Sequence, residues 1–252
     1  GGVKASELSV VDEQIIAVLE KQLEAQAIVG YSAEGQELWR KGLASAQYAI
    51  GDRAFVVISG QQVSVHNLSD GKETTSFKLA DGFRISASGA DVAIESGHVL
   101  ITGNLGARLL VYKLDGTPVA DIAGGDLRQV AISSGHLMYF DGSSLHGRAL
   151  SGGKEWQSPG VLEPYAVSGS ILYYIKAPNA EVEVQTLIAR SLNAEKVLYE
   201  KALPASEEVR LAGTDEDGAI VEFVDSGEWA FLNARGGERL RQPVRSASFR
   251  AL

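Results

Sequence analysis

The side chains that could do chemistry include a serine pair next to a histidine, in the segment Ser133-Ser134-Gly135-His136. A serine hydrolase needs an activated serine, a base within hydrogen-bond reach and a carboxylate that orients the base. Ser134 and His136 are close neighbours in a segment of turn composition, where such side chains seldom converge. The sequence also lacks a Gly-x-Ser-x-Gly motif. We therefore expect no nucleophilic catalysis at this serine pair.

Two histidines follow turn glycines at matching positions, His98 in ESGH and His136 in SSGH. Imidazole nitrogens are common ligands of divalent metals, so matching positions on neighbouring repeats could bring both rings to one ion. The corresponding positions elsewhere in the chain do not complete a strong ligand set. His98 and His136 are therefore metal candidates, and inherited repeat sequence is the alternative explanation. We expect His66 and His146 to face solvent.

The loop Thr214-Asp215-Glu216-Asp217-Gly218 has the density of oxygen ligands that Ca²⁺ prefers. It lacks the spaced acidic series and the distal glutamate of an EF-hand loop. Aspartate and glycine are also expected in a tight turn for backbone reasons. Asp215 and Asp217 are calcium candidates on this basis, with a purely structural turn as the alternative. The sequence indicates no other cofactor.

Composition excludes several classes of chemistry. The 252 residues contain no cysteine, which excludes disulfides, thiolate nucleophiles and cysteine-based zinc or iron–sulfur sites. The net charge of −9 disfavours non-specific binding to nucleic acids or anionic membranes. Five arginines form a local basic run near the C-terminus, which we interpret as a solvated end: Arg235, Arg239, Arg241, Arg245 and Arg250.

Short apolar segments separated by Gly, Asp and Ser clusters must position these side chains. Strand-like runs rich in Val, Ile and Tyr on either side of a turn cluster predict β-hairpins. A first type of hairpin has turns near Asp12, Gly51, Gly97, Gly135, Gly169 and Asp217. A second type alternates with it, with turns near Gly35, Gly71, Gly116, Gly153, Ala194 and Gly237. Two hairpins about every 40 residues are typical of a β-propeller blade with four strands.

The second hairpins resemble the PQQ-like repeat, in which a Gly-containing turn is followed by a Gly-x-x-x-Trp run. The matching residues are Gly35-Gln36-Glu37-Leu38-Trp39 and, more loosely, Gly152-Gly153-Lys154-Glu155-Trp156. The resemblance implies a quinoprotein-like propeller. It implies no bound quinone, since the dedicated cofactor residues of the quinone-binding family enzymes cannot be mapped onto this chain. Trp39 and Trp156 are expected to pack between blades, whereas Trp229 is a candidate for a surface contact.

The sequence thus predicts an all-β propeller of six four-stranded blades, with seven as the alternative, in one domain over residues 1–252. The blades are expected at 5–43, 44–80, 81–124, 125–159, 160–204 and 205–244, and residues 245–252 are expected to form a closing strand that completes the ring. Residues 12–30 also fit a helix, because Ile15, Leu19 and Leu23 lie four apart. We favour strands there.

The intact repeats without a convergent catalytic set favour a non-enzymatic scaffold that binds a protein partner in an assembly or envelope setting. The alternative is a carbohydrate-active or metal-dependent propeller enzyme, or a ligand-binding protein, with its site at the mouth of the channel. No apolar run is long enough for a membrane-spanning helix. Because the chain begins Gly1-Gly2 without Met, we expect a processed or engineered product from which an export leader could have been removed.

Overall fold

The structure is a computed structural model that describes residues 4–11, 13–21, 24–44, 46–51, 53–83, 85, 91–103, 105–180 and 182–243. The chain divides into two compact units, Gly1–Arg128 (unit 1) and Gln129–Leu252 (unit 2). All regular elements in the described ranges are β-strands, and no helix there is long and apolar enough to cross a membrane. The predicted all-β fold class is confirmed.

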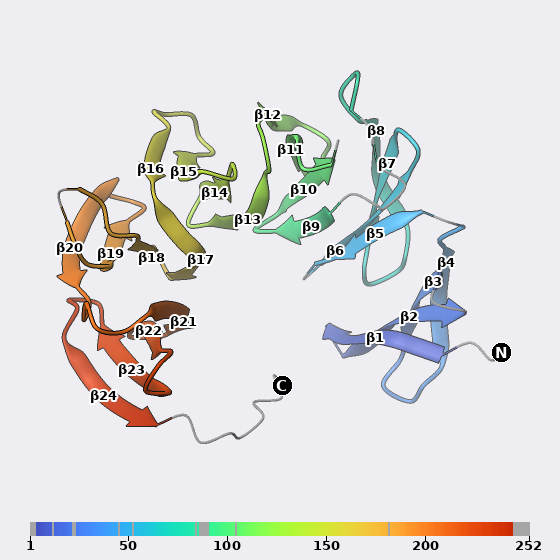
Figure 1. Cartoon of the computed structure of the whole chain (residues 1–252). Helices are drawn as coiled ribbons and strands as arrows, with labels where there is room; N and C mark the ends of the chain where they lie inside the picture. The colour runs from blue at the N-terminus through green and yellow to red at the C-terminus, as the bar shows by residue number, and fades with distance from the viewer. Residues whose placement is uncertain are drawn as a thin grey trace. The chain divides into compact units, whose positions relative to one another are not determined.

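The described part of unit 1 contains three four-stranded antiparallel sheets, blades 1 to 3 (Figure 1). The strands of each sheet are adjacent in chain order. Blade 1 comprises β1 (Lys4–Val11), β2 (Gln14–Lys21), β3 (Glu24–Tyr31) and β4 (Glu37–Gly42). Blade 2 comprises β5 (Gln47–Ile50), β6 (Ala54–Ser59), β7 (Gln62–Asn67) and β8 (Glu73–Lys78). Blade 3 comprises β9 (Asp91–Glu95), β10 (His98–Gly103), β11 (Arg108–Lys113) and β12 (Pro118–Ala123).

Three further sheets of the same topology, blades 4 to 6, follow in unit 2, whose first strand begins at the unit boundary. Blade 4 comprises β13 (Arg128–Ser133), β14 (His136–Phe140), β15 (Ser144–Ala149) and β16 (Trp156–Pro159). Blade 5 comprises β17 (Val161–Ser168), β18 (Ile171–Lys176), β19 (Thr186–Ser191) and β20 (Lys196–Ala202). Blade 6 comprises β21 (Val209–Asp215), β22 (Gly218–Phe223), β23 (Glu228–Asn233) and β24 (Glu238–Pro243).

Left-handed residue pairs close the first hairpins of blades 3 and 4. Ser96 and Gly97 have φ values of 48° and 74°, and Ser134 and Gly135 have φ values of 46° and 72°. Two consecutive residues with positive φ are what a type I′ turn requires, and its twist matches that of the flanking strands. The Ser-Gly pairs of ESGH and SSGH are therefore turn residues.

The N-terminal segment forms strands, and the helical alternative for residues 12–30 is wrong. β2 pairs with β3 from Ile15 opposite Tyr31 to Lys21 opposite Glu24. Ile16 and Val18 lie two residues apart and are both buried in the cluster that joins blades 1 and 2. That burial has the period of a strand and overrides the helix propensity of the Glu-, Ala- and Leu-rich sequence. Asp12, the expected turn position of the first hairpin, lies outside the described residues.

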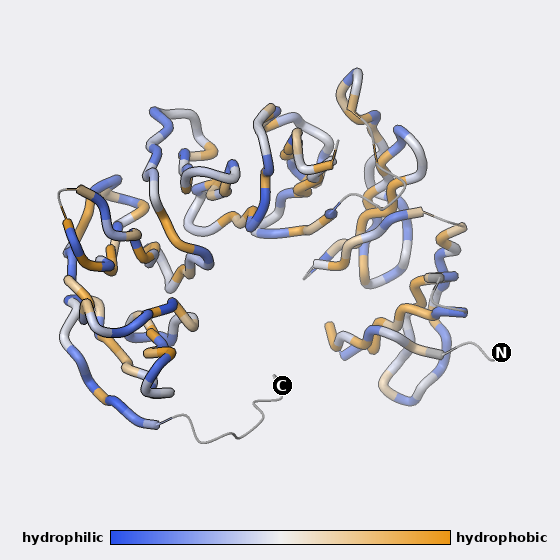
Figure 2. Tube along the Cα trace, in the orientation of Figure 1, coloured by the Kyte–Doolittle hydropathy of each residue, from blue (hydrophilic) through white to orange (hydrophobic). Residues whose placement is uncertain are grey.

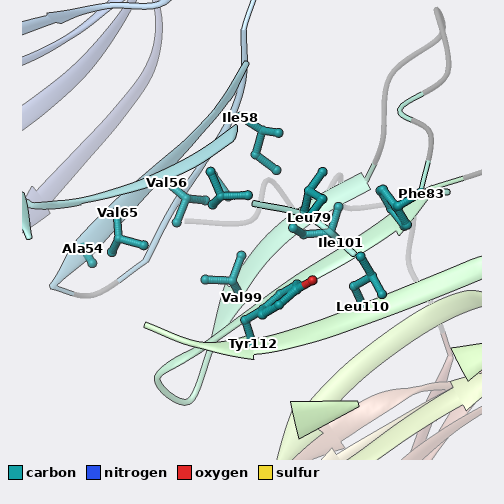
Figure 3. Packing of buried hydrophobic residues seen from close by; sticks show 12 residues of the cluster. Ala54, Val56, Ile58, Val65, Leu79, Phe83, Val99, Ile101, Leu110 and Tyr112 are labelled. Atoms are coloured by element: carbon teal, nitrogen blue, oxygen red, sulfur yellow. The ribbon is translucent and has the colours of Figure 1, made fainter. Parts of the chain in front are cut away.

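Blade 2 supplies side chains to both neighbouring blades of unit 1. Val56 and Ile58 pack in a cluster that includes Val99 and Ile101 of blade 3 (Figure 3), whereas Phe55 packs in the cluster shared with blade 1. A strand that is buried on both faces is apolar at nearly every position, which explains the run AFVVI in β6.

Blade 5 has the same role in unit 2. Tyr173 and Ile175 pack against blade 6, and Leu172 and Tyr174 pack against blade 4. The outermost strand of blade 6, β24, is mostly hydrophilic (Figure 2), and all six of its residues are exposed. The predicted closing strand, residues 245–252, lies outside the described residues. Ring closure and the single-domain boundary therefore stay predictions.

Candidate functional site

The serine pair of SSGH joins blade 4 to blade 5. Ser133 Oγ and Ser134 Oγ both donate hydrogen bonds to the carbonyl oxygen of Gly169, at 3.1 and 3.0 Å. Gly169 lies in the turn of the first hairpin of blade 5. His136 Nδ1 lies 3.0 Å from the carbonyl oxygen of Ser134 and not against a serine hydroxyl. The three side chains thus contact backbone carbonyl oxygens and not one another. Nucleophilic catalysis would require a contact between a serine hydroxyl and the histidine.

The next interface of unit 2 repeats this use of hydroxyl groups. Ser168 Oγ donates to the carbonyl oxygen of Asp215 at 2.8 Å, and Thr214 Oγ1 donates to that of Val167 at 3.1 Å. These two bonds and the two from the SSGH serines join the first hairpins of consecutive blades.

The two metal-candidate histidines lie in different units. His98 begins β10 and its Nδ1 lies 2.9 Å from the carbonyl oxygen of Ser96. His136 begins β14 and makes the equivalent contact to Ser134, with its Nε2 4.0 Å from a carboxylate oxygen of Glu195. Each ring therefore closes its own turn. Within the described residues, no group of three or more His, Asp or Glu side chains could hold a metal ion. A metal shared between the two histidines stays a prediction.

The two calcium-candidate aspartates contact an arginine. Arg239 of β24 donates to the carboxylate of Asp215 and, at 2.6 Å, to that of Asp217. The second oxygen of Asp215 accepts the backbone N–H groups of Asp217 and Gly218 at 3.0 and 2.9 Å. Desolvation raises the pKa of Asp215, but these hydrogen bonds outweigh it and the pKa is lowered. A guanidinium is thus placed between the two carboxylates, where the sequence had suggested a metal ion.

The predicted basic run is partly neutralised in the described residues. Arg239 pairs with the two aspartates. Arg241 makes a two-pronged ion pair with Glu238 at 2.9 and 3.1 Å and lies 3.5 Å from Glu228. The guanidinium of Arg241 also lies 4.1 Å above the ring of Phe223. Arg245 and Arg250 lie outside the described residues.

A network around His146 in blade 4 was missed by sequence reasoning, and the expectation that His146 faces solvent is wrong. The side chain is 12% exposed, with Nε2 2.8 Å from Asp141 and Nδ1 2.7 Å from Glu155. The ring stacks on Tyr139 at a centroid distance of 4.9 Å, and the tyrosine hydroxyl donates to the same oxygen of Glu155 at 2.8 Å. Full hydrogen bonding requires a proton on both ring nitrogens. The two carboxylates lie on opposite sides of the ring, which does not suit one shared metal ion.

The carboxylate of Asp141 is the most strongly stabilised group of this network. Desolvation raises its pKa, but this is outweighed by hydrogen bonds from the Ser143 N–H and hydroxyl, from His146 and from the Ser144 N–H. The net result is a pKa well below the ordinary value of 3.8. The carboxyl group is therefore ionised at neutral pH.

His66 in blade 2 is buried, and the expectation that it faces solvent is also wrong. The residue is 2% exposed and its ring stacks on Phe55 at 4.7 Å. Nδ1 lies 3.1 Å from the carbonyl oxygen of Gly71, and Nε2 lies 3.1 Å from the hydroxyl of Ser64. Burial lowers the pKa of His66 from its ordinary value of 6.5, and the contact with Gly71 opposes this only in part. Neither histidine had a local signal of burial, because a neighbouring aromatic ring covers each.

Trp39 and Trp156 each lie across a glycine of the adjacent strand. A Cβ atom on Gly30 would overlap the Trp39 indole, and a Cβ on Gly147 would overlap the Trp156 indole. The spacing from glycine to tryptophan is the same in both blades. Both glycines are therefore required for packing.

Each tryptophan then contacts the next blade. Trp39 stacks on Phe55 at 5.3 Å, and the guanidinium of Arg190 lies 4.3 Å from the Trp156 ring. The predicted packing of these tryptophans between blades is confirmed. Trp229 is partly buried on β23, and its role as a surface contact stays a prediction.

A cleft of about 350 Å³ lies between β20 of blade 5 and blade 6. Its floor consists of the buried side chains Val221, Phe223 and Leu232. Charged side chains line its mouth, namely Lys201, Glu238 and Arg241. An apolar floor with a few polar groups at the rim is typical of sites that bind small molecules or peptide side chains.

Comparison with known proteins gives the class of the fold. No protein-family model and no curated protein matches the sequence. BamB from Moraxella catarrhalis is similar in structure, with a TM-score of 0.52 and 16% identity over 95% of this chain and 74% of that one. Kluyveromyces lactis Hsv2 gives a TM-score of 0.54 and 11% identity over 92% and 75%. A Kluyveromyces lactis Hsv2 whose loop 6CD is replaced by a Gly-Ser linker gives 0.57 and 10% over 98% and 84%.

These proteins are β-propellers, and the six four-stranded sheets of the described residues fit the same architecture. The described part of the chain is therefore an all-β propeller with six blades. At such low identity the likeness concerns the fold alone.

Proposed function

We propose that the chain is a non-enzymatic β-propeller scaffold that binds a protein partner within a larger assembly or envelope complex. The observation that carries the proposal is the engagement of the reactive side chains in structural contacts. Ser133 and Ser134 join two blades, and Arg239 neutralises the acidic turn of blade 6. Rigid, cross-connected blades suit a protein that presents a fixed surface.

The finer proposal is that the blades belong to the PQQ-like repeat type. The packing of Trp39 on Gly30 and of Trp156 on Gly147 supports it, because the same contact recurs in the two blades that carry the Gly-x-x-x-Trp run. A propeller supports many unrelated functions, so the repeat type by itself assigns none.

The test of the scaffold function is affinity capture with the purified chain as bait in an extract of the native source, followed by mass spectrometry. We expect the same protein to be enriched in replicate captures over an empty matrix. The proposal would be overturned if replicate captures enriched no protein while the purified chain turned over members of a glycan or lactone library.

The alternative function is an enzyme or ligand-binding protein, and the observation that favours it is the His146 network. Glu155 keeps 41% of its side chain exposed next to a histidine and a tyrosine, a combination that can transfer protons. If this alternative is right, Glu155→Gln abolishes turnover of a library substrate without lowering stability. If the network is structural, the same substitution lowers stability and no substrate is found.

A further inference from the structure

The first residue of the second strand of a blade reaches the second-hairpin turn of the next blade at two places in the chain. Gln14 begins β2, and its Nε2 donates to the carbonyl oxygen of Ser69 in the β7–β8 turn at 3.0 Å. His136 begins β14 in the same way, and its Nε2 lies 4.0 Å from Oε1 of Glu195 in the β19–β20 turn. Hydrogen bonds between nitrogen and oxygen span about 2.7–3.2 Å. The imidazole therefore lacks the direct hydrogen bond that the amide of Gln14 makes.

His136 has the tautomer and the orientation of a metal ligand. Its Nδ1 lies 3.0 Å from the carbonyl oxygen of Ser134, and a carbonyl oxygen can only accept, so Nδ1 carries a proton. In the neutral ring the lone pair is then on Nε2, which faces the carboxylate of Glu195. Metal-binding histidines commonly donate their other ring N–H to a backbone carbonyl oxygen, which fixes the ring. Nε2 is therefore available as a ligand without any change of the turn.

The turn that carries Glu195 is fixed, whereas its carboxylate is free to move. The Glu195 N–H donates to the carbonyl oxygen of Leu192 at 3.2 Å, and the Glu195 carbonyl oxygen accepts from Arg190 at 2.9 Å. Leu192 is buried in the cluster between blades 4 and 5. The side chain of Glu195 is 47% exposed, and that of His136 is 9% exposed. The site thus has one ligand that is packed in place and one that can adjust.

The separation and the kinds of ligand atom suit a zinc ion. Zn²⁺ binds imidazole nitrogen and carboxylate oxygen at about 2.1 Å, so two such ligands of a tetrahedral site lie about 3.4 Å apart. The observed 4.0 Å reaches that value when the exposed carboxylate of Glu195 moves by a fraction of an ångström. Ca²⁺ and Mg²⁺ favour sites made of oxygen atoms and gain less from an imidazole. Within the described residues no third His, Asp or Glu joins the pair, so two coordination positions are left for water.

We propose that Nε2 of His136 and the carboxylate of Glu195 bind one Zn²⁺ ion, which joins blade 4 to blade 5. The site differs from the one expected from the sequence, because the second ligand comes from the turn of the next blade and not from His98. His98 makes the same contact with its own turn, at 2.9 Å, but no carboxylate of the described residues forms an ion pair with it. The proposal is independent of the scaffold function, since the ion is bound with or without a partner.

The test is isothermal titration calorimetry of Zn²⁺ into the metal-free full chain. We expect one site per chain, and we expect His136→Gln and Glu195→Gln each to weaken its affinity at least about tenfold, because each removes one of two protein ligands. His98→Gln is the matched control, a histidine in the same kind of turn, and is expected to leave the affinity unchanged. The proposal is overturned if either ligand variant binds Zn²⁺ like the wild type. It is also overturned if His98→Gln weakens binding as much, because the ion is then shared between the two histidines.

A second measurement separates loss of the ligand from loss of folding. Glu195→Gln keeps the size of an exposed side chain, so its melting temperature without metal is expected to equal that of the wild type. Saturating Zn²⁺ binds the folded chain across two blades, so it is expected to raise the melting temperature of the wild type and not that of Glu195→Gln. Equal rises in the two proteins would place the ion elsewhere and overturn the proposal.

Discussion

His66 is a buried histidine whose surroundings favour the neutral ring. Phe55 covers one face of the ring, and Gly71 and Ser64 provide a partner for each nitrogen. Lys41 and Glu73 are the charged groups that act on it, in opposite directions. Burial lowers the pKa of His66 below 6.5 in the folded chain, so on acidification this histidine binds a proton in the unfolded chain at a higher pH than in the folded chain. Acid therefore shifts the folding equilibrium towards the unfolded state.

The predicted consequence is a stability that falls as the pH drops below 6.5 and that depends on His66. His66→Phe keeps an aromatic ring but removes the titrating group, so its free energy of unfolding is expected to change less over that range. Urea titrations of both proteins at a series of pH values measure the difference. Parallel curves for the two proteins would show that His66 does not contribute to the pH dependence.

The carboxyl group of Asp141 titrates at a lower pH than His66. Hydrogen bonds lower its pKa, whereas burial lowers the pKa of His66. Its carboxylate has a pKa below 3.8 in the folded chain because His146, Ser143 and Ser144 donate to it. The stability that it contributes is present above pH 3.8 and is lost as the pH falls towards the folded pKa. The wild type is therefore expected to be more stable than Asp141→Asn above pH 3.8, and the gap is expected to close in acid. A gap that stayed constant on acidification would contradict this assignment.

At the scale of the elements, tryptophan and glycine act as a pair across neighbouring strands. Gly30→Ala places a methyl group against the indole of Trp39, and overpacking of this kind costs about 1–3 kcal/mol. Gly42→Ala in the same blade is the matched control, because its added Cβ meets no atom within 4 Å. Chemical denaturation is expected to show a loss of stability for Gly30→Ala alone. Equal effects of the two substitutions would mean that the tryptophan moves aside.

The strands and turns could be predicted from sequence because their causes are local. The Ser-Gly pairs at residues 96–97 and 134–135 carry the positive φ values that a two-residue turn needs, and strand periodicity marks the buried runs. The sites could not be predicted in the same way. Burial of His66 depends on the ring of Phe55, and Arg239 reaches Asp215 from a different hairpin.

At the scale of the whole molecule, repetition explains why reactive residue types occur without a reaction. The first-hairpin turns recur from blade to blade, and in unit 2 their hydroxyl groups bond to the backbone of the neighbouring turn. Differences between repeats then mark the places where function can be sought. One such difference is Lys201, which lies opposite Leu187 of β19 at the register position where blade 2 has Phe77 opposite Val63 of β7.

The serine pair of SSGH joins blades 4 and 5, and the free energy of unfolding of the double variant Ser133→Ala, Ser134→Ala tests this structural role. Loss of two exposed hydrogen bonds is expected to lower it by about 1 kcal/mol, while capture of the partner stays at the wild-type level. Ser151→Ala, an exposed serine of the same blade, is the control and is expected to change nothing. Unchanged stability of the double variant, together with loss of turnover of a library substrate, would show that the serine pair serves catalysis and not structure.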